Sequence, residues 1–184
     1  MTEDSVLPAD EENPPPAHQD LRLLAPVATG LLACLNTELD EAGRPVTRAA
    51  LYHGTTGPPW DDCDCETGAR KGQAWVRVVE VRPVSQTAFN SGGKPLGCQV
   101  DQWQARFELG VVRCVSMPDD SGTPPTGAEQ TADALSAYAD AVVLQDATDS
   151  CDVLVDRLVS VEAWRPIGPS GGCAGSTLTL LVEL

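Results

Sequence analysis

The sequence predicts an α+β domain in which an antiparallel sheet made of two hairpins carries helices on one face. Two observations support this: some segments repeat apolar residues every three or four positions, and others alternate apolar with polar residues. The order helix, strand, strand, helix, helix, strand, strand packs most simply in that way. The 184 residues, 42% of them apolar, suit a single domain.

The N-terminal segment is expected to lie outside this domain. Residues 1–17 combine acidic side chains with three consecutive prolines and few large apolar residues. Ordering such a segment would cost chain entropy with little burial in return. We therefore predict a disordered acidic tail over residues 1–17 and one domain over residues 18–184.

The first helix is predicted from Asp20 to Glu41, where leucines and valines form one stripe. Pro26 suits its first turn. The stripe comprises Leu21, Leu24, Val27, Leu31, Leu32, Leu35 and Leu39. Residues 43–72 are rich in glycine and proline, and only Ala50–Tyr52 indicates a short strand there.

The first hairpin is predicted from two β-rich segments. Residues 73–82 favour a strand that Pro83 ends, because proline cannot donate to a ladder. Residues 85–98 are expected to form a loop. The partner strand is predicted over residues 103–115, and the residues on one side of it are Trp103, Ala105, Phe107, Leu109 and Val111.

The second helix begins at a predicted capping box, in which Thr126 and Glu129 satisfy each other's backbone donors. It is expected to run to Leu144. Its predicted buried residues are Ala128, Leu135, Tyr138, Ala139 and Val142. A shorter helix is predicted over residues 150–158, and its buried face comprises Cys151, Leu154, Val155 and Leu158.

The second hairpin ends the chain. Residues 161–165 and 176–184 are predicted strands, and the glycine-rich residues 166–175 are the predicted loop. The last strand alternates Leu178, Leu180, Val182 and Leu184. Tryptophans in strands are usually core residues, so we expect Trp75, Trp103 and Trp164 to be buried.

Charge and hydropathy exclude several classes of function. The formal net charge is −15, from 27 acidic and 12 basic residues, which disfavours tight binding of nucleic acid. No apolar run approaches the ~18 residues that a membrane helix needs, and the acidic N-terminus is unlike a secretory signal. We expect a soluble protein made in the cytoplasm, with no membrane partner.

The seven cysteines raise the question of a metal site. Cys63, Cys65, Cys98 and His53 are candidate zinc ligands, but structural zinc sites favour ligand pairs two to four residues apart, and only one close pair occurs here. A disulfide from Cys63 or Cys65 to Cys98, or buried thiols, would explain the same residues. The odd count leaves at least one cysteine unpaired within the chain, and we predict no metal and no cofactor.

The sequence also lacks the residues that catalysis requires. Only two histidines occur, His18 and His53, so a nucleophile with a base is not expected. No phosphate-binding glycine motif and no H-E-x-x-H motif is present. We predict that the protein is not an enzyme and has no catalytic residues.

Five segments carry a resemblance to a known family. They are WDDCDC from residue 60, GQAWVRVV from residue 72, FELGVVRC from residue 107, the P-D-D and P-P lead of the second helix over residues 118–125, and WRPIGPSGGCAGSTLTLLVEL from residue 164. Over residues 20–184 the chain resembles the tail terminator and head-to-tail connector proteins of siphophages that infect actinobacteria, and its predicted order of elements is similar to the tail terminator fold.

This resemblance implies a structural virion protein located in the phage neck and made in the host cytoplasm. It implies a homo-oligomeric ring, expected to be a hexamer, that caps the tail tube protein and joins it to the head-side connector. Genomic DNA would pass through the lumen without specific binding. The expected interface residues, in the hairpin loops and a proline-rich loop, are Trp60, Phe89, Lys94, Ile167 and Ser170.

Three alternatives remain at this stage. Within the same neck, the chain could be the head-to-tail stopper or connector. A non-viral binding module with a cysteine-tied loop is a second reading, and a metal-dependent enzyme built on Cys63, Cys65 and His53 is a third. The last two predict a monomer, whereas the neck proteins predict an oligomer.

Overall fold

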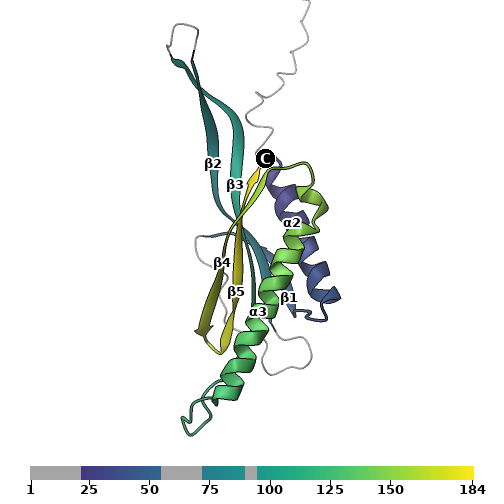
Figure 1. Ribbon diagram of the computed structural model, residues 1–184, viewed down its shortest axis with the longest axis vertical. Coiled ribbons are helices and arrows are strands. Elements are labelled where there is room, and N and C mark those ends of the chain that lie inside the picture. The colour runs from purple at the N-terminus through teal and green to yellow at the C-terminus, as the bar shows by residue number, and fades with distance from the viewer. Residues whose placement is uncertain (1–21, 55–71, 90–94) are drawn as a thin grey trace, which may run out of the picture.

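The computed structural model describes residues 22–54, 72–89 and 95–184, with side chains left out over residues 85–101. In this part of the chain, two α-helices and a short 3₁₀ helix accompany a five-stranded sheet, and both α-helices lie on one face of the sheet (Figure 1). The α+β class is therefore confirmed. The predicted tail lies in residues 1–21, outside the described residues.

The sheet is mixed, not purely antiparallel as predicted. Its strands are β1 (Arg48–Tyr52), β2 (Gln73–Phe89), β3 (Pro95–Cys114), β4 (Val159–Ser170) and β5 (Cys173–Glu183), in the order β1-β2-β3-β5-β4. β1 runs parallel to β2, and the other neighbours are antiparallel. Two parallel neighbours need a long connection, and about twenty residues separate β1 from β2.

The predictions that Pro83 ends a strand and that residues 85–98 form a loop were wrong. β2 continues through Pro83, which is paired with Trp103, and only residues 90–94 separate β2 from β3. The last pair between β1 and β2 is Tyr52 with Arg77, so β2 is an edge strand from there on. Proline has no backbone N–H to donate, and it is tolerated on an edge strand because no neighbouring strand needs that hydrogen bond there. The two strands form an arm that extends beyond the helices (Figure 1).

The predicted loop over residues 166–175 is also mostly strand. Pairing between β4 and β5 continues as far as Ser170 with Cys173, and the turn consists of Gly171 and Gly172. Both glycines have positive φ angles, 57° and 77°, a conformation that glycine adopts without a steric penalty. The glycine-rich sequence therefore serves a tight hairpin turn.

The first helix, α2 (Leu24–Glu41), forms as its apolar stripe predicts. It starts two residues before Pro26, which occupies the first turn, and it buries Val27, Ala28, Leu31, Leu35 and Leu39. These side chains share one core with the alternating inward residues of β3 and β5, such as Phe107 and Leu180. The apolar sides predicted for these two strands face this core, although Trp103 is only half-buried.

The second helix, α3 (Gly127–Asp149), begins at the predicted capping box and ends five residues later than expected. The backbone N–H of Glu129 donates to Oγ1 of Thr126, and Oε2 of Glu129 accepts the backbone N–H of Thr126 at 2.8 Å. Its buried residues are Asp140, Val143, Leu144, Ala147 and Thr148.

The buried face predicted for this helix was wrong. Leu135, Tyr138 and Val142 are 60%, 56% and 60% exposed, while Ala128 is exposed and Ala139 is only half-buried. The helix is turned the other way, and the cause is the burial of a charged residue, Asp140.

Two arginines draw Asp140 into the interior. Oδ1 of Asp140 accepts Nε of Arg44 at 2.8 Å, and Oδ2 accepts Nε of Arg113 at 2.7 Å. Arg113 also donates to the backbone oxygen of Arg44 at 2.6 Å. A buried carboxylate is tolerated when it is paired and hydrogen-bonded in this way. With Asp140 inside, Val143 and Leu144 face the sheet as well.

The helix predicted over residues 150–158 is reduced to a 3₁₀ turn, η1 (Asp152–Leu154). Cys151 and Leu154 are buried, but Val155 and Leu158 are 64% and 72% exposed. Asp156 has a φ of 65°, which is incompatible with a continuing right-handed helix.

A disulfide that the sequence did not predict anchors this segment. Cys151 is bonded to Cys34 of α2, with a Cα–Cα distance of 5.6 Å and a sequence separation of 117. Cys114 and Cys173 are also disulfide-bonded. The Cys34–Cys151 bond ties α2 to the segment that directly follows α3.

Candidate subunit interface

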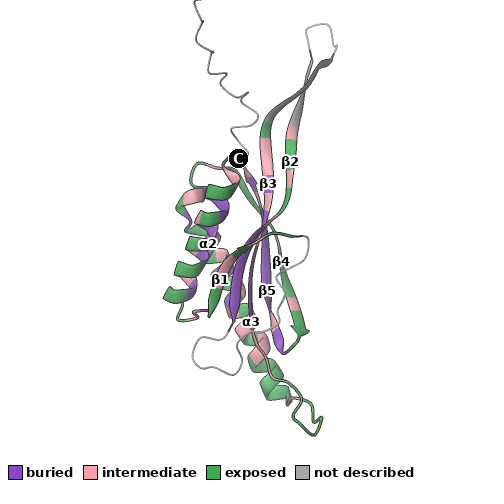
Figure 2. Cartoon of the chain, turned by 180° about the vertical axis from the view of Figure 1, so that it is seen from behind, coloured by how far each residue is buried: buried purple, intermediate pink, exposed green. Residues whose placement is uncertain are grey.

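Exposed apolar side chains gather along α3 and the edge strand β4. Eight of the eleven large apolar residues that are exposed in the described part of the chain belong to this region. They are Leu135, Tyr138 and Val142 of α3, Val155 and Leu158 of the connection, and Val159, Val161 and Trp164 of β4. We call this set the α3–β4 surface, and Figure 2 shows exposed residues along both elements.

The position of β4 in the sheet explains why these residues are uncovered. Val161 is paired with Leu180 and Trp164 with Leu178, so both side chains point to the face that the helices cover. However, α3 packs on β5 and β3, and β4 lies one strand further out. The rings of Tyr138 and Trp164 meet edge to face with centroids 6.0 Å apart, which joins the two halves into one surface.

The exposure of its side chains makes the α3–β4 surface a candidate protein contact. Its eight side chains are between 37% and 72% exposed. The largest apolar patch on a typical monomer is ~300–600 Å², and one side of a stable interface covers ~800 Å².

Side chains, and not the strand edge, would make this contact. β4 has no neighbour on its outer side among the described strands. Its pairing is nonetheless irregular between Val161 and Ala163, and Pro166 lacks a backbone donor. Bulges and prolines are the devices that keep edge strands from pairing with other chains.

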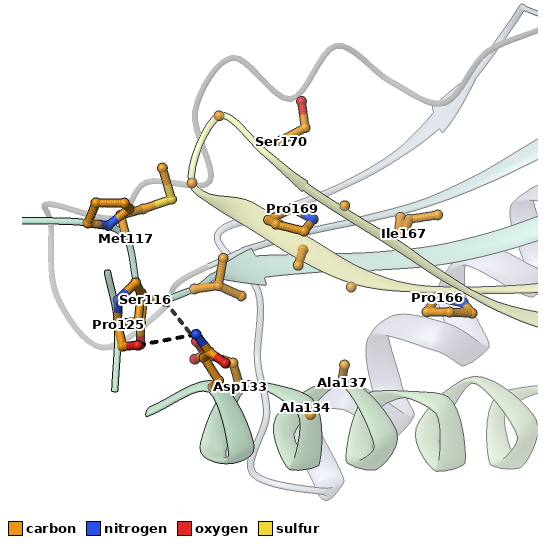
Figure 3. A pocket seen from close by; sticks show the side chains of 18 of the residues that line it. Ser116, Met117, Pro125, Asp133, Ala134, Ala137, Pro166, Ile167, Pro169 and Ser170 are labelled. Atoms are coloured by element: carbon orange, nitrogen blue, oxygen red, sulfur yellow. Dashed lines mark hydrogen bonds between the residues drawn. The ribbon is translucent and has the colours of Figure 1, made fainter. Parts of the chain in front are cut away.

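A pocket of about 570 Å³ adjoins this surface (Figure 3). It lies between α3, the turn of the β4–β5 hairpin and the loop that precedes α3. Ala134 and Ala137 of the helix face Ile167 and Pro169 of the hairpin. Tyr138 lines the pocket and also belongs to the α3–β4 surface. Because the walls are mainly apolar, the pocket suits an apolar side chain of a partner.

The segment that contributes α3 and the preceding loop to the pocket is acidic, and Asp133 lines the pocket itself. No Lys or Arg occurs between Cys114 and Asp156. The Ser121 hydroxyl and the Thr123 backbone N–H lower the pKa of Asp119. The backbone N–H of Thr126 lowers the pKa of Glu129. Both carboxylates therefore stay ionised at pH values where an ordinary carboxyl group is protonated.

The opposite face of the sheet carries paired charges beside a small buried apolar cluster of Trp75, Val112 and Cys173. Arg77 binds Glu108 through two nitrogens, at 2.7 and 2.9 Å. Arg106 donates to Glu162 at 2.7 Å and also contacts Glu80. The Arg106 hydrogen bond lowers the pKa of Glu162. These charges compensate one another.

The structure places two of the five predicted interface residues in one site. Ile167 and Ser170 both line the pocket, Ile167 being half-buried and Ser170 exposed. Phe89 is the last residue of β2, and its side chain is not among those described. Trp60 and Lys94 lie outside the described residues.

Sequence reasoning missed Leu135, Tyr138 and Val142 as interface residues because it assigned them to the core. The one available signal was that α3 has apolar residues on two faces, when a helix packed on a single sheet needs one. Trp75 is buried and Trp103 half-buried, but Trp164 is 37% exposed, so the prediction that it is a core residue was wrong.

The candidate zinc ligands are not brought together by any described contact. His53 is exposed, whereas Cys63, Cys65 and the side chain of Cys98 lie outside the described residues. Within residues 22–54, 72–84 and 102–184, no three His, Cys, Asp or Glu side chains are grouped to hold a metal ion. Over the same residues, no helix has the length and apolarity to cross a bilayer.

Comparison with known proteins yields no family and no curated protein that matches this chain.

Proposed function

We propose that this chain is the tail terminator of a long-tailed phage, a structural subunit that forms a ring on the end of the tail tube. The ring is expected to be a hexamer, and it presents a surface to the head-side connector. Its work is steric and interfacial: it stops tube growth and joins two parts of the virion. The resemblance of residues 20–184 to that family gives the proposal its direction.

The α3–β4 surface is the observation that carries the proposal. Burying ~500 Å² of apolar surface at about 25 cal/mol per Å² contributes on the order of 12 kcal/mol. A contribution of this size offsets most of the ~4–15 kcal/mol that association costs in lost freedom. Its eight exposed apolar side chains are therefore a structural reason for the folded chain to associate.

The charge of the chain fits a channel through which DNA passes. The formal net charge is −15, and the loop and helix from residue 115 to residue 156 contain no basic side chain. A protein binds DNA mainly by neutralising phosphates with Lys and Arg. A ring of acidic subunits would repel the phosphates and let the polymer move.

The mass of the purified full chain, measured by native mass spectrometry across low micromolar concentrations, tests the ring. We expect a closed oligomer, and we expect it to bind the ends of tubes assembled from the tail tube protein of the same phage and to stop their elongation. A chain that stays at 19.4 kDa and leaves tube growth unchanged would refute the proposal. A ring that binds the head-side connector but not the tube would indicate the stopper instead.

A matched pair of variants tests the surface itself. Val142→Glu places a charge in the α3–β4 surface, and Val79→Glu places the same charge at an exposed valine of β2. Both valines are exposed, at 60% and 44%, so both variants should fold. We expect only Val142→Glu to lose the oligomer.

A further inference from the structure

The pocket beside α3 is lined mainly by apolar and small residues. Its volume of about 570 Å³ falls within the ~300–1,000 Å³ of sites that enclose most of a bound ligand. Ala134 and Ala137 of α3 form one wall, and Ile167 and Pro169 of the β4–β5 hairpin form the facing wall (Figure 3). The short side chains of the alanines leave room between the two walls. A ligand that fills this room must be largely apolar, because it replaces water against apolar walls.

The carboxylate of Asp133 is the one charged group that lines this pocket among the residues that the structure describes. Its Oδ2 accepts the backbone N–H of Ser116 at 2.9 Å, and this hydrogen bond fixes the direction of the side chain. No described residue donates a hydrogen bond or contributes an ion pair to Oδ1. Because Asp133 is half-buried, a cation that met Oδ1 would be partly shielded from water, and the attraction would be stronger than in bulk solvent.

The arginines on either side of the pocket in the sequence are engaged with other carboxylates. Arg113 binds the buried carboxylate of Asp140 at 2.7 Å. Arg165 interacts electrostatically with Glu162, which pairs with Arg106 on the opposite face of the sheet. The uncompensated charge in the pocket is therefore negative, and it is complementary to a cationic group of a ligand.

The pocket is continuous with exposed apolar surface, which favours a polypeptide as its occupant. Tyr138 lines the pocket and also belongs to the α3–β4 surface. Its ring meets that of Trp164 with centroids 6.0 Å apart. A small molecule confined to the pocket would leave Trp164 and Val142 uncovered, whereas a polypeptide segment can fill the pocket and continue along the surface.

We propose that this pocket binds a short segment of a partner polypeptide in which apolar side chains flank a lysine or arginine. The apolar side chains pack between α3 and the β4–β5 hairpin, and the cationic group binds Oδ1 of Asp133. The segment then passes Tyr138 and reaches the α3–β4 surface. This inference concerns the chemistry of the partner and does not depend on the proposed ring.

Blocked pentapeptides test this recognition on the full chain. We expect acetyl-Gly-Leu-Lys-Leu-Gly-amide to bind saturably and to shift the backbone amide resonances of Met117, Ala134 and Gly172, which line the pocket. Replacing the lysine with glutamate should weaken binding by about fivefold or more, since an exposed ion pair contributes up to about that factor. Replacing both leucines with alanine should abolish binding. No saturable binding, or equal binding of the lysine and glutamate peptides, would overturn the inference.

A matched pair of variants locates the binding site. Ala134→Phe fills the pocket from α3, and Ala132→Phe places the same ring at an exposed position of the same helix outside the pocket. We expect only Ala134→Phe to lose the lysine peptide. Equal affinities of the two variants would place the peptide elsewhere and refute the proposed site. Circular dichroism spectra and melting temperatures near those of the wild type establish that both variants fold.

A second pair of variants tests the charge. Asp133→Asn keeps an oxygen that can accept the Ser116 N–H and removes only the negative charge. The ratio of affinities for the lysine and glutamate peptides should approach one in this variant and stay unchanged in Asp146→Asn, at an exposed position of the same helix. A ratio that survives in Asp133→Asn would rule out this carboxylate as the cation site. A chain that recognises the lysine peptide but forms no ring would contradict the terminator proposal alone.

Discussion

The carboxylate of Asp140 lies inside the protein and accepts a hydrogen bond from Nε of Arg113 at 2.7 Å. This contact joins the middle of α3 to the end of β3. Arg44, which precedes β1, binds the other oxygen of the same carboxylate at 2.8 Å. One buried acid therefore sets the rotation of α3 and, with it, the set of residues that α3 exposes.

Removing this acid should destabilise the fold strongly. Asp140→Ala leaves two arginines, with side chains 25% and 15% exposed, without their carboxylate, and breaking a buried pair costs roughly 3–5 kcal/mol. Urea unfolding followed by far-ultraviolet circular dichroism measures the loss. Asp146→Ala, at an exposed position of the same helix, is the control and should stay within about 0.5 kcal/mol of the wild type. Equal effects of the two changes would contradict this account.

The disulfide between Cys34 and Cys151 should contribute substantially to stability. It closes a segment of 117 residues, and a crosslink of that span lowers the entropy of the unfolded chain by the equivalent of about 4–5 kcal/mol. We expect serine at both positions to lower the free energy of unfolding by an amount of this order under non-reducing conditions. Intact mass after thiol alkylation confirms that the other cysteines keep their state. A double variant as stable as the wild type would show that the bond adds nothing.

The ion pair of Glu162 with Arg106 should make stability depend on pH. The hydrogen bond from Arg106 lowers the pKa of Glu162 in the folded state, whereas an unfolded glutamate titrates near roughly 4.3. The pair therefore contributes its full stabilisation above the unfolded pKa and loses it as pH falls through the lower folded pKa. Glu162→Gln should be less stable than the wild type at pH 7, and the difference should shrink below about pH 4. A difference that grows on acidification would have the wrong sign.

Gly110 should not tolerate a side chain. A Cβ there would lie 2.1 Å from the ring of Trp75, which is buried at 1% exposure. Overpacking of this kind costs about 1–3 kcal/mol, so we expect Gly110→Ala to lower the thermal midpoint and to shift tryptophan fluorescence. Gly127→Ala is the matched control because a Cβ at Gly127 meets nothing within 4 Å. Comparable losses in the two variants would rule out the contact as the cause.

Local features were predictable where the periodicity of a segment allows one solution. The stripe of α2, the alternation of Leu178, Leu180 and Val182, and the capping box of Thr126 and Glu129 all form as expected. Each of these features depends on residues of a single helix or a single strand that are close together in the sequence. Such signals are short-range, and nothing elsewhere in the chain overrides them here.

The candidate interface was not predictable in the same way. α3 has apolar residues on two faces, and hydrophobicity alone favoured burying Leu135, Tyr138 and Val142. The face of α3 that is buried instead carries Asp140, which pairs with Arg44 and Arg113. These two arginines are 96 and 27 residues away in the sequence. Likewise, the strand that continues past Pro83 does so because β1 has already ended beside it.

The sequence by itself determined the α+β class, the positions of the two α-helices, the central parts of the strands, and the acidic charge. The tertiary structure decided the parallel pairing of β1, the Cys34–Cys151 bond and the face that α3 exposes. The physical reason is the sequence separation of the contacts involved. Periodicity within one segment shows which residues can share a face. Which face is buried depends on contacts between segments that only the folded chain brings together.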